Sequence, residues 1–258
     1  SELLRRVGSA DPQLRMPPPE AGSALTAGEI SLLRSWIEAG AVFQQHWSFQ
    51  PLVRPPVPVS AAAPAGWRDN PIDGFVYAGL AGQNRLPSER ADWSTLVRRV
   101  WFDLTGMPPT EQELHRAEEQ SWEQIVDECL QSPHFGERMA VEWLDMARYA
   151  DTDGYFGDKP RQIWLYRDWL IQAFNRNLPY DQMTIEQLAG DLLPDATIQQ
   201  RIATGFNRSH MSNDETGLID EEFRLEYVAD RTDTTMTVWL GLTAGCARCH
   251  DHKYDRLT

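Results

Sequence analysis

Apolar residues recur every three or four positions over most of the chain, which is the spacing of an amphipathic α-helix. Residues 96–104 illustrate the pattern: their apolar side chains share one helical face, Asp92 precedes them as an N-cap, and Gly106 and Pro108 follow as a stop. Alternation of the kind that marks strands is scarce, and the sequence contains no internal repeat. We therefore predict an all-α fold, with a multi-helix domain that follows a short α-helical segment and a proline-rich linker.

Several predicted helices begin with a capping box, in which a Ser or Thr and a Glu or Gln three residues later satisfy each other's backbone N–H groups. The pairs are Thr26 with Glu29, Ser121 with Gln124, and Thr197 with Gln200. In the helix that Ser121 begins, Cys129 falls on the apolar face, so we predict a packed core thiol there. Residues 221–242 are predicted to form one long helix that ends just before two further cysteines.

Proline is concentrated between residues 51 and 66, where it favours an extended and semi-stiff segment. We therefore predict a domain boundary in this region. The predicted divisions are a short helical unit at residues 1–48, a linker at 49–69 and a large helical domain at 70–258.

Charge narrows the range of partners. The net charge of −14 disfavours binding to the phosphate backbone of nucleic acids and to anionic lipid, while basic proteins remain compatible with it. No apolar run reaches the roughly 20 residues of a membrane span. The sequence opens at Ser1 inside a helical pattern and without Met, so we interpret it as part of a longer protein whose export signal would lie upstream. Ten tryptophans suggest a core of large rings, or a flat ligand packed among rings.

The run Cys246-Ala247-Arg248-Cys249-His250 carries the clearest chemistry in the sequence. One interpretation is a zinc site that uses both cysteines with His250 and His252, although two adjacent ligands strain the backbone. A second is a thioredoxin-like dithiol, which normally opens a helix in a βαβ setting. A third is covalent haem attachment, for which C-x-x-C-H is the signature.

The spacing suits haem best. Two thiols separated by two residues can form thioethers with the two vinyl groups on one edge of a porphyrin, and His250 then lies beneath the ring as an iron ligand. Cys246 and Cys249 are therefore the predicted attachment residues of a haem c. Such attachment occurs outside the cytoplasm, so the motif predicts a periplasmic or otherwise exported protein.

Longer stretches of the chain resemble a known family. The segments "SPHFGERMAVEWLDMARYADTDGY" (132–155), "DRTDTTMTVWLGLT" (230–243) and "GLTAGCARCHDHKYD" (241–255) are similar to those of large planctomycete cytochrome-c-like proteins. In these proteins a cytochrome c module precedes a helical domain of unknown function that has its own C-x-x-C-H. The resemblance implies that residues 1–48 are the C-terminal remnant of that module and that Met16 is the sixth iron ligand of its haem. The attachment cysteines of that haem are not in this sequence, so we expect Met16 to be an exposed loop residue here.

The second axial position of the haem at His250 has several candidates. His210 is far enough upstream to reach it, and Met211 and Met236 are alternatives, whereas His252 is too close in sequence and is expected either to cap local backbone or to face solvent. The carboxylates of the loop 151–158 are typical either of a cation or sugar site or of a solvated turn.

Three functions follow from this sequence. The first is a periplasmic c-type haem protein that transfers electrons to or from an unidentified protein. The second is a haem-dependent oxidoreductase that acts on carbohydrate or a related substrate. The third is a structural or interaction domain held by zinc.

Overall fold

The computed structural model describes residues 1–258 except residues 44, 45 and 256. The described residues form eleven α-helices and no β-strand, which confirms the predicted all-α class. An isolated antiparallel bridge between Thr152 and Pro160 closes one loop. The helices are α1 (Glu2–Val7), α2 (Ala27–Glu38), α3 (Pro71–Gly82), α4 (Trp93–Thr105), α5 (Glu111–Ala117), α6 (Trp122–Gln131), α7 (Pro133–Met146), α8 (Trp164–Asn175), α9 (Tyr180–Ala189), α10 (Ile198–Ala203) and α11 (Asp220–Thr235).

The predicted helix starts are confirmed by their hydrogen bonds. All three capping boxes form at the N-termini of α2, α6 and α10, and a fourth, Thr110 with Glu113, begins α5. Asp92 caps α4 by accepting a hydrogen bond from the Thr95 amide at 2.8 Å, and Gly106 ends that helix at a φ of 74°. Short polar side chains therefore set where most of these helices begin, as their spacing indicated.

The chain divides into two compact units, Ser1–Ser88 and Glu89–Thr258. In the first unit, part of the proline-rich segment packs on α3. The Tyr77 hydroxyl donates to the Ala62 carbonyl at 3.0 Å, and a side chain at Gly74 would meet the Pro58 carbonyl at 2.9 Å. This unit therefore includes α3 together with the segment predicted as a linker, and the predicted domain boundaries stay a prediction.

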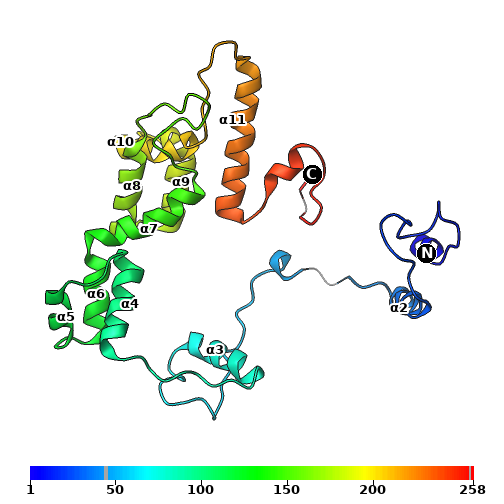
Figure 1. The fold of residues 1–258 in the computed structure, drawn as a ribbon, viewed down its shortest axis with the longest axis horizontal. Helices are drawn as coiled ribbons and strands as arrows, with labels where there is room; N and C mark the ends of the chain where they lie inside the picture. Colours follow the sequence, from blue (N-terminus) through cyan, green and yellow to red (C-terminus); the bar gives the residue numbers. More distant parts are fainter. Residues whose placement is uncertain (44–45, 256) are drawn as a thin grey trace. The chain divides into compact units, whose positions relative to one another are not determined.

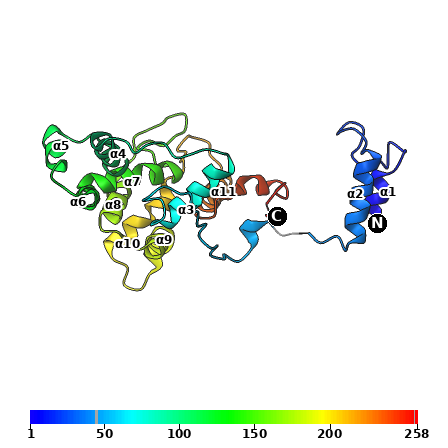
Figure 2. The same cartoon turned by 90° about the horizontal axis from the view of Figure 1, so that it is seen from below.

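The second unit contains two hydrophobic cores. Figures 1 and 2 show α4, α5 and α6 gathered as one group and α8, α9 and α10 as another, with α7 running between them. The smaller core joins α4, α5 and α6 and contains Val97, Trp101, Ala117, Ile125 and Cys129. The larger core joins α7 to α10 and contains Ala140, Ala147, Tyr166, Trp169, Leu170, Ala173, Met183, Ala203 and Phe206. Cys129 is 1% exposed, which confirms the predicted core thiol.

The long helix predicted before the cysteines is present, but its register changes. α11 ends at Thr235, and a π-helical turn, η4 (Met236–Leu240), continues it to Gly241. Three threonine hydroxyls, ending with Thr235, donate to carbonyls four residues earlier just before this point, a contact that loosens helices. Within η4, Trp239 packs edge-on against Phe206 and Trp143, so the register change coincides with docking of this end on the larger core.

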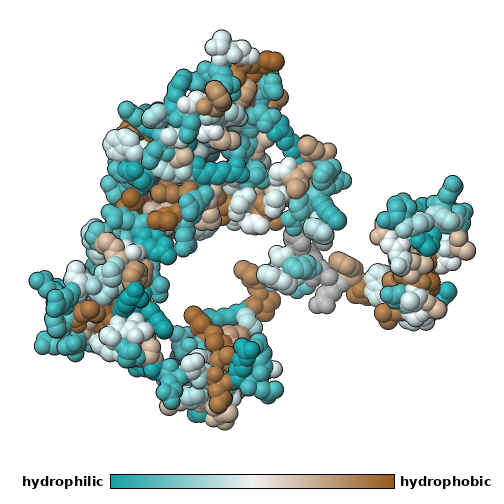
Figure 3. Space-filling model, viewed as in Figure 1, coloured by the Kyte–Doolittle hydropathy of each residue, from teal (hydrophilic) through white to brown (hydrophobic). Residues whose placement is uncertain are grey.

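Among the described residues, no helix is both long and apolar enough to cross a bilayer. Hydrophilic residues cover much of the visible face of the second unit (Figure 3).

Candidate functional site

Both cysteines of the C-x-x-C-H motif are exposed at a short turn that follows α11. Cys246 lies in the 3-10 turn η5 (Ala244–Arg248), and the Cys249 amide donates to the Cys246 carbonyl at 3.4 Å. A 3-10 turn has three residues per turn, so Cys246 and Cys249 lie on the same side of it. Both thiols are free of disulfide bonds. The turn therefore presents two thiols together toward solvent.

His250 is also exposed, and its imidazole is oriented by backbone. Its Nδ1 lies 2.8 Å from the Asp251 carbonyl oxygen. A carbonyl only accepts hydrogen bonds, so this contact assigns the ring proton to Nδ1 and leaves the lone pair on Nε2. Metal-bound histidines use the same arrangement, in which the second ring nitrogen donates to a carbonyl or carboxylate. The three residues thus fit a covalently attached haem, with two thiols on one side of a turn and an imidazole nitrogen available for iron.

Acidic residues of α11 hold this turn in place. The Gly245 amide donates to Asp233 Oδ1 at 2.7 Å, and the Arg248 guanidinium forms a two-pronged ion pair with Glu226. The hydrogen bonds from Arg248 lower the pKa of the Glu226 carboxyl below its ordinary value. The sequence analysis did not identify Glu226 or Asp233 as partners of this turn. Their spacing could have indicated it, because Glu226, Asp230 and Asp233 lie on one side of α11 directly before the motif.

The residues after the motif form a turn around His252. Its side chain is only 10% exposed, and its Nδ1 accepts hydrogen bonds from the amides of Tyr254 at 3.2 Å and Asp255 at 2.8 Å. Of the two expected environments, His252 therefore has the first: it caps local backbone and orders the chain next to His250.

The turn at residues 244–249 is called the attachment turn below, after the predicted role of its two cysteines. A cavity of about 340 Å³ lies between this turn and α11. Ala229, Thr232 and Met236 line it on one side, and Ala244 and Ala247 line it on the other. With three residues per turn, Ala244 and Ala247 lie on a different side of the turn from Cys246 and Cys249. The cavity is therefore behind the turn, whereas the thiols face outward.

His210 occupies another face of α11. Its ring stacks on Tyr227 with centroids 4.5 Å apart, and its Nδ1 lies 2.6 Å from the Met211 carbonyl oxygen. Burial lowers the pKa of His210. At 3.6 residues per turn, Tyr227 is rotated by about 100° or more from both Glu226 and Asp233, which touch the attachment turn. The structure thus places His210 away from the motif, and its role as an iron ligand stays a prediction.

The remaining candidates lie elsewhere. Met16 is 42% exposed in a loop of the first unit, the environment expected for it in this chain. In the acidic loop 151–158, Asp158 accepts a hydrogen bond from the Gly154 amide at 2.9 Å, and Asp151 accepts one from the Tyr149 hydroxyl at 2.7 Å. These carboxylates therefore stabilise the loop itself.

Among the residues that the structure describes, no three His, Cys, Asp or Glu side chains are grouped so as to hold a metal ion. A zinc site would use such a group, whereas a haem would take one protein ligand from the motif.

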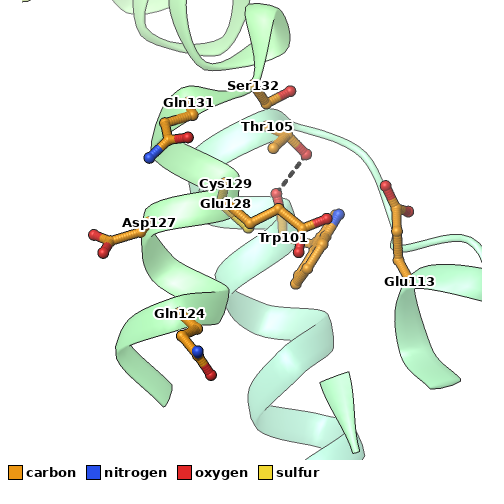
Figure 4. Close-up of a pocket in the computed structure, with 9 residues that line it drawn as sticks. All are labelled: Trp101, Thr105, Glu113, Gln124, Asp127, Glu128, Cys129, Gln131 and Ser132. Atoms are coloured by element: carbon orange, nitrogen blue, oxygen red, sulfur yellow. Dashed lines mark hydrogen bonds between the residues drawn. The ribbon is translucent and has the colours of Figure 1, made fainter. Parts of the chain in front are cut away.

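A second cavity, of about 450 Å³, lies among α4, α5 and α6 (Figure 4). The carboxylate of Glu128, which lines this cavity, accepts hydrogen bonds from Arg116 at 2.6 Å and from Gln120 at 3.1 Å. The Asp127 side chain points away from Trp101 (Figure 4). Burial raises the pKa of Cys129 to about 11, so its thiol is a poor nucleophile at neutral pH. Of the reactive groups that line this cavity, Glu128 is therefore already paired and Cys129 is a poor nucleophile.

Residues 71–258 match the family described as "PSCyt2: Protein of unknown function (DUF1549)". No curated protein and no solved structure matches the chain.

Proposed function

The chain belongs to the PSCyt2 family of unknown function (DUF1549), and on that premise we propose that it is an exported c-type haem protein that transfers electrons. One observation carries the proposal: the two free thiols of Cys246 and Cys249 are exposed on one turn, and His250, the next residue in the chain, is exposed with its Nδ1 held by the Asp251 carbonyl.

The residues of the motif would hold the haem in complementary ways. Each thiol would add across one vinyl double bond, with sulfur bonding to one vinyl carbon and the thiol hydrogen passing to the other, so that there is no leaving group and no net oxidation. His250 would supply an iron ligand through Nε2, and the Asp251 carbonyl fixes the orientation of its ring. The bound haem supplies reversible one-electron chemistry between ferric and ferrous iron.

The outward position of the attachment turn favours electron exchange with another protein. A redox group near the surface can approach that of a partner, and charge on the surrounding surface steers the encounter. Residues 1–88 contain seven acidic and seven basic side chains, so the entire net charge of −14 belongs to the second unit, which carries the motif. We therefore expect the redox partner to present a basic surface.

The test is maturation of the chain in a bacterial periplasm that contains the c-type assembly machinery. We expect a pyridine haemochrome spectrum and, by mass spectrometry, one haem on the peptide that contains Cys246 and Cys249. Replacing both with Ser should abolish attachment, while Cys129→Ser, in the smaller core, should retain it as the matched control.

Other outcomes point elsewhere. A colourless product with free thiols overturns the proposal, and a colourless product with one bound zinc supports a structural zinc domain instead. A ferric spectrum that is high-spin and changes with peroxide supports the haem-dependent oxidoreductase instead of simple electron transfer.

A further inference from the structure

Asp233 connects the attachment turn to the body of the second unit, and its geometry suggests a positioning role. We propose that Asp233, anchored by Arg148, fixes the turn so that Cys246, Cys249 and His250 are held in the arrangement that haem attachment requires. This inference rests on the proposed function for its meaning, but the contacts themselves are independent of it.

The two oxygens of the Asp233 carboxylate bind different segments. Oδ1 accepts a hydrogen bond from the Gly245 amide at 2.7 Å, and Oδ2 accepts one from Arg148 Nη2 at 3.1 Å. Arg148 also pairs with Asp230, one turn earlier on α11. Hydrogen bonds to an ionised group are roughly twice as strong as neutral ones, so this carboxylate is a firm link between the three segments.

The fit at Gly245 is close. A Cβ atom at this position would lie 3.3 to 3.4 Å from the carboxylate atoms of Asp233, tighter than an ordinary van der Waals contact. Gly245 directly precedes Cys246, so any shift of the carboxylate is passed to the first attachment residue. The absence of a side chain lets the backbone of the turn approach α11.

Arg148 has a backbone conformation that suits this task. It follows α7 with a φ of 58°, in the left-handed region that residues other than glycine rarely adopt. Such a conformation costs free energy and persists only where the surroundings fix it. It turns the chain at the end of α7 while the side chain reaches residues 82 and 85 positions later. The link therefore joins α7, α11 and the attachment turn.

The experiment compares three variants of the full chain. Asp233→Ala removes both contacts, Asp233→Asn retains an oxygen that can accept the Gly245 amide, and Asp230→Asn weakens the pairing with Arg148 without touching the turn. Hydrogen exchange of the Gly245 amide in haem-free protein should be about tenfold faster or more in Asp233→Ala, because loss of a charged hydrogen bond shifts local opening by at least that factor. In Asp233→Asn, where a neutral acceptor replaces a charged one, exchange should fall between wild type and Asp233→Ala, and in Asp230→Asn it should remain within about threefold of wild type.

The second measurement is the fraction of chains with covalent haem after periplasmic maturation. We expect a several-fold loss in Asp233→Ala, recovery in Asp233→Asn, and no loss in Asp230→Asn. Unchanged exchange and full loading in Asp233→Ala overturn the inference. If wild type takes up no haem but exchange still accelerates in Asp233→Ala, the proposed function fails while the positioning role stands.

A folding defect in Asp233→Ala is checked by thermal unfolding. Should it occur, Gly245→Ala provides the second perturbation, because it presses on the same carboxylate from the other side. Unchanged exchange of the residue 245 amide and unchanged haem loading in Gly245→Ala also count against the inference.

Discussion

Replacing Gln187 with Leu should severely destabilise the second unit. The Gln187 side chain is fully buried on α9, and its Oε1 accepts two hydrogen bonds, from Trp143 Nε1 at 2.9 Å and from the Tyr166 hydroxyl at 2.7 Å. Its Nε2 donates to the Met183 carbonyl at 3.2 Å. One amide therefore satisfies polar groups of α7 and α8 inside the larger core.

The expected loss follows from the donors that Leu would leave behind. Leu has a similar volume, so packing changes little, but the Trp143 and Tyr166 donors lose their shared acceptor. An unsatisfied buried donor costs about 1–3 kcal/mol, which gives about 2–6 kcal/mol for the pair. A domain is stable by only about 5–15 kcal/mol, so the variant should be partly unfolded at moderate temperature.

Urea unfolding of the full chain, followed by circular dichroism, measures this change. Gln172→Leu is the matched control, because the Gln172 side chain is exposed on α8 and its loss should change the free energy of unfolding by less than about 0.5 kcal/mol. Adding Tyr166→Phe to Gln187→Leu removes one stranded donor and should recover about 1 kcal/mol or more. A loss below about 1 kcal/mol in Gln187→Leu, with no recovery in the double variant, would refute the reasoning.

Three further predictions use other parts of the fold. Gly136→Ala should prevent close packing of α7 on α8, because its Cβ would overlap the Ile171 carbonyl; thermal unfolding should show a loss of several kcal/mol, or no folded protein. Because burial lowers the pKa of His210 below its ordinary value of 6.5, the unfolded chain binds more protons near and below that pH; stability should fall on acidification through this range, and less steeply in His210→Asn when urea midpoints are compared. In haem-free protein, iodoacetamide should label Cys246 and Cys249 within minutes and Cys129 only after unfolding, as peptide mass spectrometry would show; equal rates would contradict the burial of Cys129.

Local patterns predicted the helices and their starts, because capping and amphipathic spacing act within a few residues. Thr26, Ser121 and Thr197 therefore indicated the correct N-termini, and the apolar stripe after Ser121 placed Cys129 in a core. The order of the cysteines and His250 likewise indicated a chemistry without reference to the fold. None of these inferences required knowing which helices meet.

The contacts that hold the candidate site could not be inferred in this way. Arg148 and Asp233 are 85 positions apart, and no local pattern around either residue predicts that they pair. The same limit applies to His210, whose distance along the chain permitted contact with the motif but whose ring stacks on Tyr227 instead. Such pairings depend on tertiary packing, which periodicity alone does not specify.

The attachment turn illustrates why these long-range contacts matter. A 3-10 turn of five residues has few hydrogen bonds of its own, and forming so short a helix in water is unfavourable. Its cysteines face outward, so the turn gains little from burial of those side chains. It must therefore take its order from α11, where Asp233 binds its beginning and Glu226 binds its end through Arg248. Trp239 of η4, the turn that continues α11, packs against the larger core, so the order of an exposed site depends on aromatic packing at the C-terminal end of this helix.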